Sequence, residues 1–401
     1  MKADWKKSTL GNVLSTLKNG LNCKQSKDIA GQKISRIESI STASFDINRV
    51  GFSEISESDK AKFKLSKGDI LFSHINSPIH VGKTATFNED EDVYHGVNLL
   101  LMRPNEEVLP AYLELYLKSL FESGYWLKRC KQSVNQASVN QQDIAQVAIE
   151  YPSSVTEQRR IVSLLDEAFA DIATAKANAE KNLQNARELF NSHLDAIVVH
   201  AQENGEIVAL SELATDITDG DHMPPPKVEH GLPFITIGNI DKQTRTIDFS
   251  DTFKVPREYF DALKANKKPM RGDVLYTVTG SFGIPVLVED DTEFCFQRHI
   301  GLIRSKAEVD STWLQYLLQS PQVFNQAADG ATGTAQKTVS LKVLRNLQVP
   351  RISLKDQLAY IETLRSVEAE CRRLETIYRQ KLTALDDLKK SLLHQAFSGQ
   401  L

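Results

Sequence analysis

The 401-residue sequence lacks the features expected of a membrane, secreted or disulfide-bonded protein. No apolar run approaches the roughly 18 residues that a membrane-spanning helix needs. The first residues, MKADWKKSTLGN, contain no apolar segment of the kind found in secretory signals. The four cysteines stand far apart and form no CxxC pair, so neither a disulfide framework nor a zinc site is expected. We therefore expect a cytoplasmic protein that does not bind membranes.

An excess of positive charge is also missing, because the formal net charge is −4. A hydrophobic content of 41% and a mean hydropathy of −0.32 are typical of a globular protein with a substantial core. Binding to nucleic acid would then depend on a local basic face, since acidic helices elsewhere can balance such a face in the total.

The signatures of catalysis are incomplete. Gly82-Lys83-Thr84 matches the end of a phosphate-binding loop, but Ser77 stands where the first glycine belongs. A turn from which Lys83 can reach a phosphate is the simpler interpretation. NSPI (76–79) only partly matches the Asn-Pro-Pro-aromatic motif of amino-methyltransferases. The chain has no Pro-Asp pair for a nuclease site, no His-Glu-x-x-His and no serine elbow, so we expect a non-catalytic protein.

The segment DGDHMPPP (219–226) combines acidic residues with a histidine. Asp219, Asp221 and His222 are possible metal ligands, but their spacing leaves no evident further ligand. We expect no metal here. A loop shaped by Gly220 and the prolines, with polar side chains available to DNA, explains the pattern better.

The chain repeats a series of segments in the same order, at an offset near 200 residues. PSSVTEQRRIVSLLDEAF (152–169) matches PRISLKDQLAYIETLRSV (350–367), and KLSKGDILFS (64–73) matches KPMRGDVLYT (268–277). Ordered matches at a near-constant offset indicate an internal duplication. The remaining pairs are LGNVLSTLKNG (10–20) with LSELATDITDG (210–220), HGVNLLLMRPN (95–105) with RHIGLIRSKAE (298–308), and QASVNQQDIAQVAIEYP (136–152) with QKTVSLKVLRNLQVP (336–350).

Each copy begins with about 150 residues of short β-like segments, such as DILFSHI and DVLYTVT. Helical stretches intervene at 111–128 and 311–328, which indicates an α+β fold with two α/β domains. The predicted boundaries are residues 1–152 and 201–351 for the two domains, and 153–200 and 352–401 for two long spacer helices.

Neither spacer segment contains glycine or proline between residues 153 and 204 or between 351 and 398. Ser153 or Ser154 with Glu157, and Ser353 before Asp356, are typical of helix starts. Apolar or small residues recur every three or four positions, as in a coiled coil. They are Ile161, Leu165, Ala168, Ile172, Ala175, Ala179, Leu183, Ala186, Phe190, Leu194 and Ile197, then Leu358, Ile361, Leu364, Val367, Cys371, Leu374, Ile377, Leu382, Leu385, Leu388 and Leu392.

A helix of about 45 residues is roughly 68 Å long and cannot bury such a stripe on a small domain. The two helices are therefore expected to pair antiparallel, with the copies related by a pseudo-twofold axis. Two unlike domains held at a fixed distance suit a ligand with two different sites, such as duplex DNA, whose half-sites one turn apart are separated by about 34–36 Å. The alternative is a bivalent coiled-coil scaffold that binds proteins and not DNA.

The whole chain resembles the DNA specificity subunits of type I restriction–modification systems. The resemblance lies in the alternation of two domains with two long helices and in short motifs. In two places the match is incomplete: LKNGLNCKQ (17–25) lacks the histidine and proline of the second copy, and LKDQLAYI (354–361) departs from the EQ-plus-basic pattern. The motifs are TDGDHMPP (218–225), KGDILF (67–72), RGDVLY (271–276), EQRRIV (157–162), Asp356-Gln357 and LLHQAFSGQL (392–401).

The resemblance implies a non-catalytic subunit that reads a bipartite, asymmetric DNA target with one half-site per domain. It also implies two modification subunits, which are adenine-N6 methyltransferases, with two ATP-dependent restriction subunits as an optional addition. S-adenosylmethionine, ATP and magnesium would then belong to the partners, and this chain would hold no cofactor.

Candidate DNA contacts are basic residues and polar loop residues, because these side chains reach phosphates and base edges. In the first copy they are Lys60, Lys62, Lys64, Lys83, Lys128, Arg129, Lys131, Gln132, Asn135 and Gln136. In the second copy they are Asp221, His222, Lys267, Lys268, Arg271, Arg298, Thr332, Thr334, Gln336 and Lys337. A solvated surface is the alternative for each lysine cluster. The Gln/Thr-rich loops are the stronger candidates because they recur in both copies.

Overall fold

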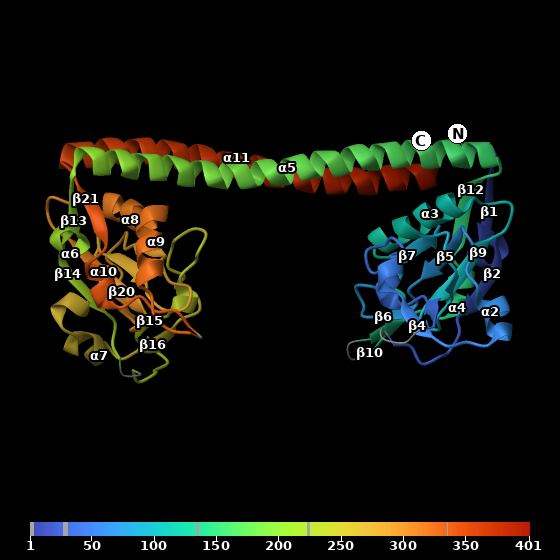
Figure 1. The fold of residues 1–401 in the computed structure, drawn as a ribbon, viewed down its shortest axis with the longest axis horizontal. Helices are drawn as coiled ribbons and strands as arrows, with labels where there is room; N and C mark the ends of the chain where they lie inside the picture. The colour runs from blue at the N-terminus through green and yellow to red at the C-terminus, as the bar shows by residue number, and fades with distance from the viewer. Residues whose placement is uncertain (1–3, 27–30, 134–135, 223–224, 335) are drawn as a thin grey trace. The chain divides into compact units, whose positions relative to one another are not determined.

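A computed structural model describes residues 4–26, 31–133, 136–222, 225–334 and 336–401. The chain forms two compact units, residues 1–180 with 380–401 (unit 1) and residues 181–379 (unit 2). Each unit mixes helices and strands, which confirms the predicted α+β class (Figure 1).

Unit 1 is built on a four-stranded antiparallel sheet in the order β2-β9-β5-β7. Three smaller sheets, β4-β3-β8, β10-β11-β6 and β1-β12, surround it. The strands are β1 (Trp5–Thr9), β2 (Leu14–Asn19), β3 (Gln32–Ile34), β4 (Gly51–Ser53), β5 (Asp69–Phe72), β6 (Ile75–Asn76), β7 (Thr84–Phe87), β8 (Val93–Tyr94), β9 (Leu100–Pro104), β10 (Lys131–Ser133), β11 (Gln136–Ser138) and β12 (Ala148–Pro152). The short helices are α1 (Leu10–Val13), α2 (Glu57–Phe63), α3 (Pro110–Glu122) and α4 (Gln141–Ala145).

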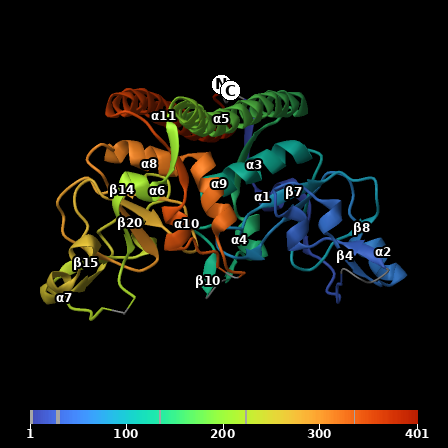
Figure 2. The same ribbon diagram turned by 60° about the vertical axis from the view of Figure 1, so that its left-hand side comes forward.

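Unit 2 repeats this topology, with main sheet β14-β20-β17-β18 and smaller sheets β16-β15-β19 and β13-β21. Its helices α8 and α9 lie beside the main sheet (Figure 2). The strands are β13 (Glu206–Ala209), β14 (Ala214–Asp219), β15 (Leu232–Ile235), β16 (Phe253–Val255), β17 (Val274–Thr277), β18 (Pro285–Leu287), β19 (Cys295–Phe296), β20 (Ile300–Ser305) and β21 (Gln348–Arg351). The helices are α6 (Leu210–Leu213), α7 (Arg257–Ala262), α8 (Ser311–Gln319), α9 (Pro321–Gly330) and α10 (Leu341–Arg345).

The central strand of each main sheet is buried on both faces. In β5, Ile70 and Phe72 face the cluster that contains α3, while Leu71 belongs to a second cluster on the opposite face. In β17, Val274 and Leu275 divide between two clusters in the same way. Burial on both faces explains why these strands are continuous apolar runs in the sequence and not strict alternations.

A buried ion pair fixes the same register in both copies. The Arg103 guanidinium donates to Asp69, with nitrogen–oxygen distances of 2.6 and 2.7 Å, and Arg304 donates to Asp273 at 2.8 Å through two nitrogens. The bidentate contact raises the pKa of both arginines. Each aspartate follows a glycine with positive φ, +88° at Gly68 and +91° in the second copy. The repeated Gly-Asp motif is therefore structural.

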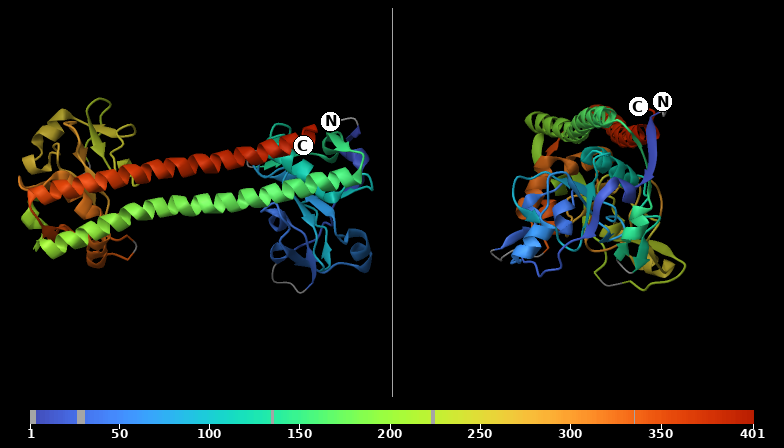
Figure 3. Two further views of the ribbon diagram at one scale, coloured as in Figure 1. Left: turned by 90° about the horizontal axis from the view of Figure 1, so that it is seen from above. Right: turned by 90° about the vertical axis from the view of Figure 1, so that its right-hand side faces the viewer.

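The long helices are α5 (Val155–Asn204) and α11 (Leu354–Ser398). Within each unit they lie side by side (Figure 3). In unit 1, the Lys176 ammonium lies 2.5 Å from Asp386, and Arg160 donates to the Leu401 carbonyl at 3.3 Å. Because the later residue of α5 contacts the earlier residue of α11 in these two pairs, the two helices pair antiparallel.

A buried glutamine attaches the start of each long helix to its domain. The Gln158 amide is fully buried; it accepts from the Leu109 N–H at 2.8 Å and donates to the Glu107 carbonyl at 2.8 Å. Gln357 makes the same contacts with the Asp310 N–H and the Glu308 carbonyl, at 2.8 and 3.0 Å. These bonds satisfy loop groups that burial would otherwise leave unpaired. The repeated motif around these glutamines thus joins each helix to its domain.

The predicted helix seam is wrong at three residues. Leu358, Ile377 and Leu388 are 51%, 41% and 46% exposed and do not lie in the buried seam. On α11 the buried and half-buried positions include Glu368 and Glu375. Long polar side chains can occupy a seam when they reach ion partners at its edge, and apolar spacing alone does not reveal such positions.

Candidate nucleic-acid interface

The polar loop of the first copy is a hairpin that extends from the central sheet. Strand β11 pairs with β6, with Ala137 opposite Asn76, and β10 pairs with β11. The Val139 N–H donates to the His74 carbonyl at 2.9 Å, which ties the hairpin to the chain that follows β5. This arrangement places three predicted contact residues, Lys131, Gln132 and Gln136, on an exposed hairpin. The fourth, Asn135, lies outside the described residues.

The polar loop of the second copy occupies the same position. The Val339 N–H donates to the Val278 carbonyl at 2.8 Å, and Thr338 forms isolated antiparallel β-bridges with Thr279 and Thr332. A side chain at Gly333, where φ is +109°, would come within 2.3 Å of the next turn's backbone, so the loop needs glycine. The loop brings together four exposed predicted residues, Thr332, Thr334, Gln336 and Lys337.

The DGDH segment forms a compact polar cluster at the end of β14. A Cβ at Gly220 would lie 2.1 Å from the Phe296 carbonyl oxygen, so the chain can cross β19 only with glycine there. The exposed His222 ring lies 2.8 Å from Asp219, and Tyr259 donates to Asp221 at 2.8 Å. The described residues include no group of three or more side chains placed to hold a metal ion.

Two further predicted residues border this cluster. The Lys267 ammonium lies 3.7 Å from Asp219 and donates to the Gly220 carbonyl at 3.1 Å, so it helps to hold the segment in place. Arg298 is exposed, and next to it burial lowers the pKa of His299, with Arg298 and His222 adding to the effect. Two cationic side chains therefore border the DGDH cluster.

The lysines of α2 have acidic neighbours. Lys60 lies 2.6 Å from Glu57, and Lys64 lies 2.6 Å from Asp92; the hydrogen bond to each carboxylate raises the pKa of the lysine. Lys62 is exposed and lies 5.1 Å from the Phe63 ring centroid. Because a paired lysine offers less free charge to a phosphate, Lys62 is the best placed of the three.

The Gly82-Lys83-Thr84 segment has a structural explanation. A Cβ at Gly82 would lie 2.1 Å from the Trp126 ring, Lys83 donates to the Ser41 carbonyl at 2.7 Å, and Thr84 is buried in β7. The lysine is half-buried and holds two loops together. This contact accounts for Lys83 without a bound nucleotide.

The remaining predicted residues are scattered. The Arg129 guanidinium stacks 3.8 Å from the centroid of Tyr125, while Lys128 is exposed. Lys268 donates to the Asp261 carbonyl at 3.0 Å, and Arg271 is exposed. These positions are surface features that the fold does not gather into one site.

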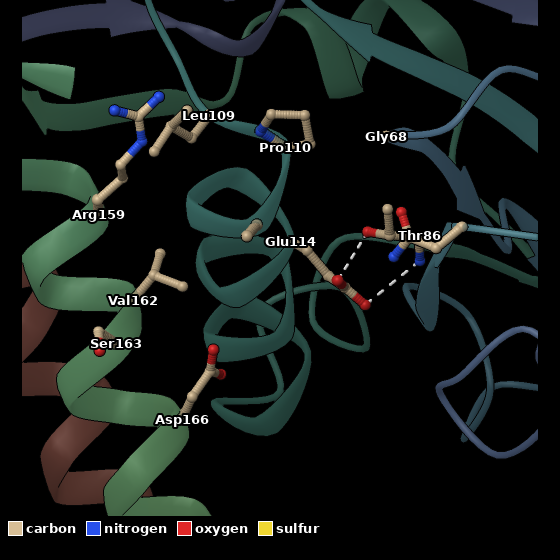
Figure 4. A pocket seen from close by; sticks show the side chains of 11 residues that line it. Gly68, Thr86, Leu109, Pro110, Glu114, Arg159, Val162, Ser163 and Asp166 are labelled. Atoms are coloured by element: carbon tan, nitrogen blue, oxygen red, sulfur yellow. Dashed lines mark hydrogen bonds between the residues drawn. The ribbon is translucent and has the colours of Figure 1, made fainter. Parts of the chain in front are cut away.

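A pocket of about 460 Å³ lies in unit 1 where α5 passes α3 (Figure 4). Glu114 accepts from the Thr86 N–H and hydroxyl at 3.3 and 2.6 Å on one side. Arg159 and Val162 of α5 line the other side. This mixed apolar and charged surface includes none of the predicted DNA contacts, so it suits a protein partner better than a nucleic acid.

The structure brings together a second group of cations that the sequence did not predict. Lys242 and Arg245, on a turn of unit 2, face arginines of α5 and α11 across a pocket of about 480 Å³. Charge runs in the sequence could not reveal this group, because its members come from three distant segments.

No helix in the described part of the chain combines the length and hydropathy of a membrane span.

Comparison with known proteins agrees with this architecture. Residues 2–183 match the family model of the type I restriction modification DNA specificity domain. A protein of Methanocaldococcus jannaschii, named as a type I restriction enzyme MjaX specificity subunit, is 29% identical over 422 residues, covering 99% of this chain and 94% of that protein. The EcoKI specificity subunit of Escherichia coli is 28% identical over 208 residues, which cover 51% of this chain and 44% of that protein.

Two solved structures share the fold over the full length of the chain. One, described under "Structural basis underlying complex assembly and conformational transition of the type I R-M system", has a TM-score of 0.77 at 19% identity and covers 100% of this chain and 99% of the other. The HsdS subunit from Thermoanaerobacter tengcongensis has a TM-score of 0.65 at 18% identity, with 100% and 98% coverage. The family-model match over residues 2–183 and the full-length relative make this chain similar to type I restriction–modification DNA specificity subunits, and the two solved structures show that it shares their fold.

Proposed function

We propose that this chain is a non-catalytic subunit that reads a bipartite, asymmetric DNA target, with one half-site for each copy. The observation that carries the proposal is the pair of polar loops, residues 131–138 and 330–338, each attached to the chain that directly follows the equivalent strands β5 and β17. Their side chains differ: Lys131, Gln132 and Gln136 stand in one, and Thr332, Gln336 and Lys337 in the other. One scaffold with two sets of donors and acceptors would read two different base sequences.

Exposed basic residues elsewhere on each copy would contact phosphates and set the register on the duplex. Lys62 and Lys128 suit this role in the first copy, and Arg271 and Arg298 in the second, because all four are exposed. Such contacts add affinity without sequence information. The acidic cluster at Asp221 would then position His222 for the groove and hold no metal.

The long helices would set the distance between half-sites and bind two modification subunits. Their outer faces expose Leu164, Leu354 and Leu358, at 41%, 45% and 51%, and the pocket beside Arg159 continues this surface in unit 1. Exposed leucines on a helix that already has a buried seam suit a protein partner. S-adenosylmethionine, ATP and magnesium would be bound by the modification and restriction subunits in a cytoplasmic complex.

Binding of duplex DNA by the chain with its modification subunit tests the proposal. The logarithm of the association constant should fall with the logarithm of salt concentration, with a slope of roughly −0.9 for each phosphate neutralised. Methylated adenines in the source genome should lie in one split, asymmetric sequence. Stable assembly of the subunits without any DNA binding would instead favour a bivalent protein scaffold.

The docking surface has its own test. Leu358→Glu and Leu164→Glu should each weaken copurification with the modification subunit without unfolding the chain, because both side chains already face solvent. Leu364→Glu is the matched contrast: that leucine is fully buried, so its replacement should unfold unit 2. Normal assembly of both exposed-site variants would place the docking surface elsewhere.

A further inference from the structure

A cationic pocket of about 480 Å³ lies in unit 2 between the turn at residues 241–246 and the helices α5 and α11. Two carboxylates, Glu368 and Glu375, face a larger number of cations in its lining. The cations are Arg187, Lys242, Arg245, Arg372 and Arg379.

Both carboxylates form ion pairs with arginines of the two long helices. Arg372 pairs with Glu368 at 2.7 Å, and Glu375 is shared by Arg379 at 2.9 Å and Arg187 at 3.4 Å. Tyr316 also donates to Glu368 at 3.1 Å. Two negative charges therefore serve three arginines before the turn is considered.

The cations of the turn have neutral partners. The Lys242 ammonium donates to the Ser281 hydroxyl at 2.8 Å, and no carboxylate among the described residues lies within 4.0 Å of it. The Arg245 guanidinium lies 3.1 and 3.3 Å from one end of the Gln319 side-chain amide, which accepts from it when the amide is turned so that its oxygen occupies that end. Burial lowers the pKa of Arg245, although Glu368 partly offsets the effect. A half-buried guanidinium without a carboxylate partner is costly, and an anion would relieve that cost.

The backbone of the turn holds Arg245 in an unfavourable conformation. Its φ is +54°, in the left-handed region that a long side chain rarely adopts. The first copy has the same turn, with Ala43 at φ +60°. In both copies an aspartate N–H closes the turn with a 2.8 Å bond, Asp46 to the Ser39 carbonyl and Asp248 to that of Asn239. The turn of the first copy, which spans Ser39–Asp46 against Asn239–Asp248, has no cation among its own residues, so the left-handed backbone conformation does not require an arginine there.

The pocket also adjoins the polar loop of the second copy. Ser281, which accepts from Lys242, directly follows Gly280, whose N–H donates to the Lys337 carbonyl at 3.0 Å. A short path of bonded residues thus joins the pocket to the loop that carries Gln336 and Lys337. A ligand that extends from this loop can reach the pocket.

We propose that this pocket binds a backbone phosphate of the DNA beside the half-site read by the second copy. The proposal rests on the proposed function and adds a sequence-independent contact that only one copy makes. A phosphodiester is the anion that continues outward from a recognised base, and arginine and lysine donors around a pocket match its oxygens. The contact would fix the register of the second domain on the duplex and leave the choice of bases to the loop.

The test uses the chain in complex with its modification subunit and a duplex carrying the mapped target. The variant Lys242→Thr with Arg245→Ala removes both cations of the turn; Lys242 is exposed, and the first copy has Ala43 at the position that corresponds to Arg245, so the variant should fold. We expect DNA affinity to fall roughly tenfold at moderate salt, and the salt slope to lose about 1 to 2, with the methylated sequence unchanged. Neutral methylphosphonates placed one at a time beside the second half-site should weaken wild-type binding at one or two positions and leave the variant unaffected.

A matched control removes two cations from unit 2 outside the pocket, Lys342→Ala with Arg373→Ala, and should leave the salt slope nearly unchanged. An unaltered slope in the pocket variant would overturn the proposed site while wild-type binding still supported the proposed function. Weakened subunit assembly with intact DNA binding would show that the pocket holds an acidic protein segment, which also contradicts the proposal. Absence of salt-dependent binding by wild type would instead contradict the proposed function itself.

Discussion

The two copies share their buried polar groups and differ in their exposed loops. Both pair a buried aspartate at the start of one main-sheet strand with an arginine of the neighbouring strand, and both bury a glutamine at the start of a long helix. By contrast, the turn at Thr42 and Ala43 is neutral, and its counterpart carries Lys242 and Arg245. The difference teaches that duplicated positions maintain the fold, whereas diverged positions are where recognition can differ between the copies.

The largest effect is expected from breaking the shared ion pair in the second copy. Asp273→Ala strands an arginine whose side chain is only 19% exposed, whereas Asp69→Ala strands one that is 40% exposed. Asp273→Ala should therefore cost about 3–5 kcal/mol of the free energy of unfolding of its domain, and Asp69→Ala clearly less. Hydrogen exchange measured separately in β17 and β5 checks both. Equal losses in the two copies would contradict the argument from burial.

Acidification should distinguish the copies next. Burial lowers the pKa of His95, in the first copy, to about 4, and lowers that of His74 in the same domain. Because the unfolded value is about 6.5, the stabilisation is fully present above pH 6.5 and is lost as the pH falls from 6.5 towards 4. Between pH 7 and 5, the lowered pKa of His95 should reduce the free energy of unfolding of the first domain by about 2 kcal/mol. Hydrogen exchange at the two pH values measures this loss, and His95→Gln should reduce it.

A smaller and more local effect is expected in the polar loops. Gln132→Ala and Gln336→Ala should each relax sequence preference at one half-site only, by about 1–3 kcal/mol at the affected base pair. Both side chains are exposed, so stability should hardly change. Mapping of methylated sites in cells that carry each variant gives the result. A preference altered at both half-sites by one variant would contradict the separation of the copies.

The smallest effect should come from Lys64, whose ammonium pairs with Asp92 on the surface. Lys64→Ala should hardly change the free energy of unfolding, as expected for an exposed pair. Its effect on the salt slope of DNA binding should be smaller than that of Lys62→Ala. A larger effect for Lys64 would show that the ion pair opens to admit a phosphate.

Much of the architecture could be predicted from the sequence, because the long helices and the duplicated motifs leave strong local patterns. The correspondence in register between strand β9 of the first copy and strand β20 of the second could not be predicted. Aligning HGVNLLLMRPN with RHIGLIRSKAE sets His95 against Arg298, whereas the ion pairs make Arg103 equivalent to Arg304. Apolar runs such as LLLM and GLIR can slide by two residues without changing which face is buried, so only the buried charge reveals the register.

The candidate site was predictable in part for the same reason. The polar loops could be found because their composition recurs in both copies. The cationic pocket could not, because Arg187, Arg245 and Arg379 approach one another only after the helices pair. Leu358, Ile377 and Leu388 were wrongly assigned to the seam because they fall at three- or four-residue spacing although their side chains are exposed.

The central claim is that each copy reads its own half of one target. Replacing residues 1–152 with the corresponding domain of a known specificity subunit, followed by genome-wide mapping of methylated adenines, tests it most directly. We predict that one half-site changes, while the other half-site and the number of base pairs between them stay the same. A target in which both halves change together would contradict the account.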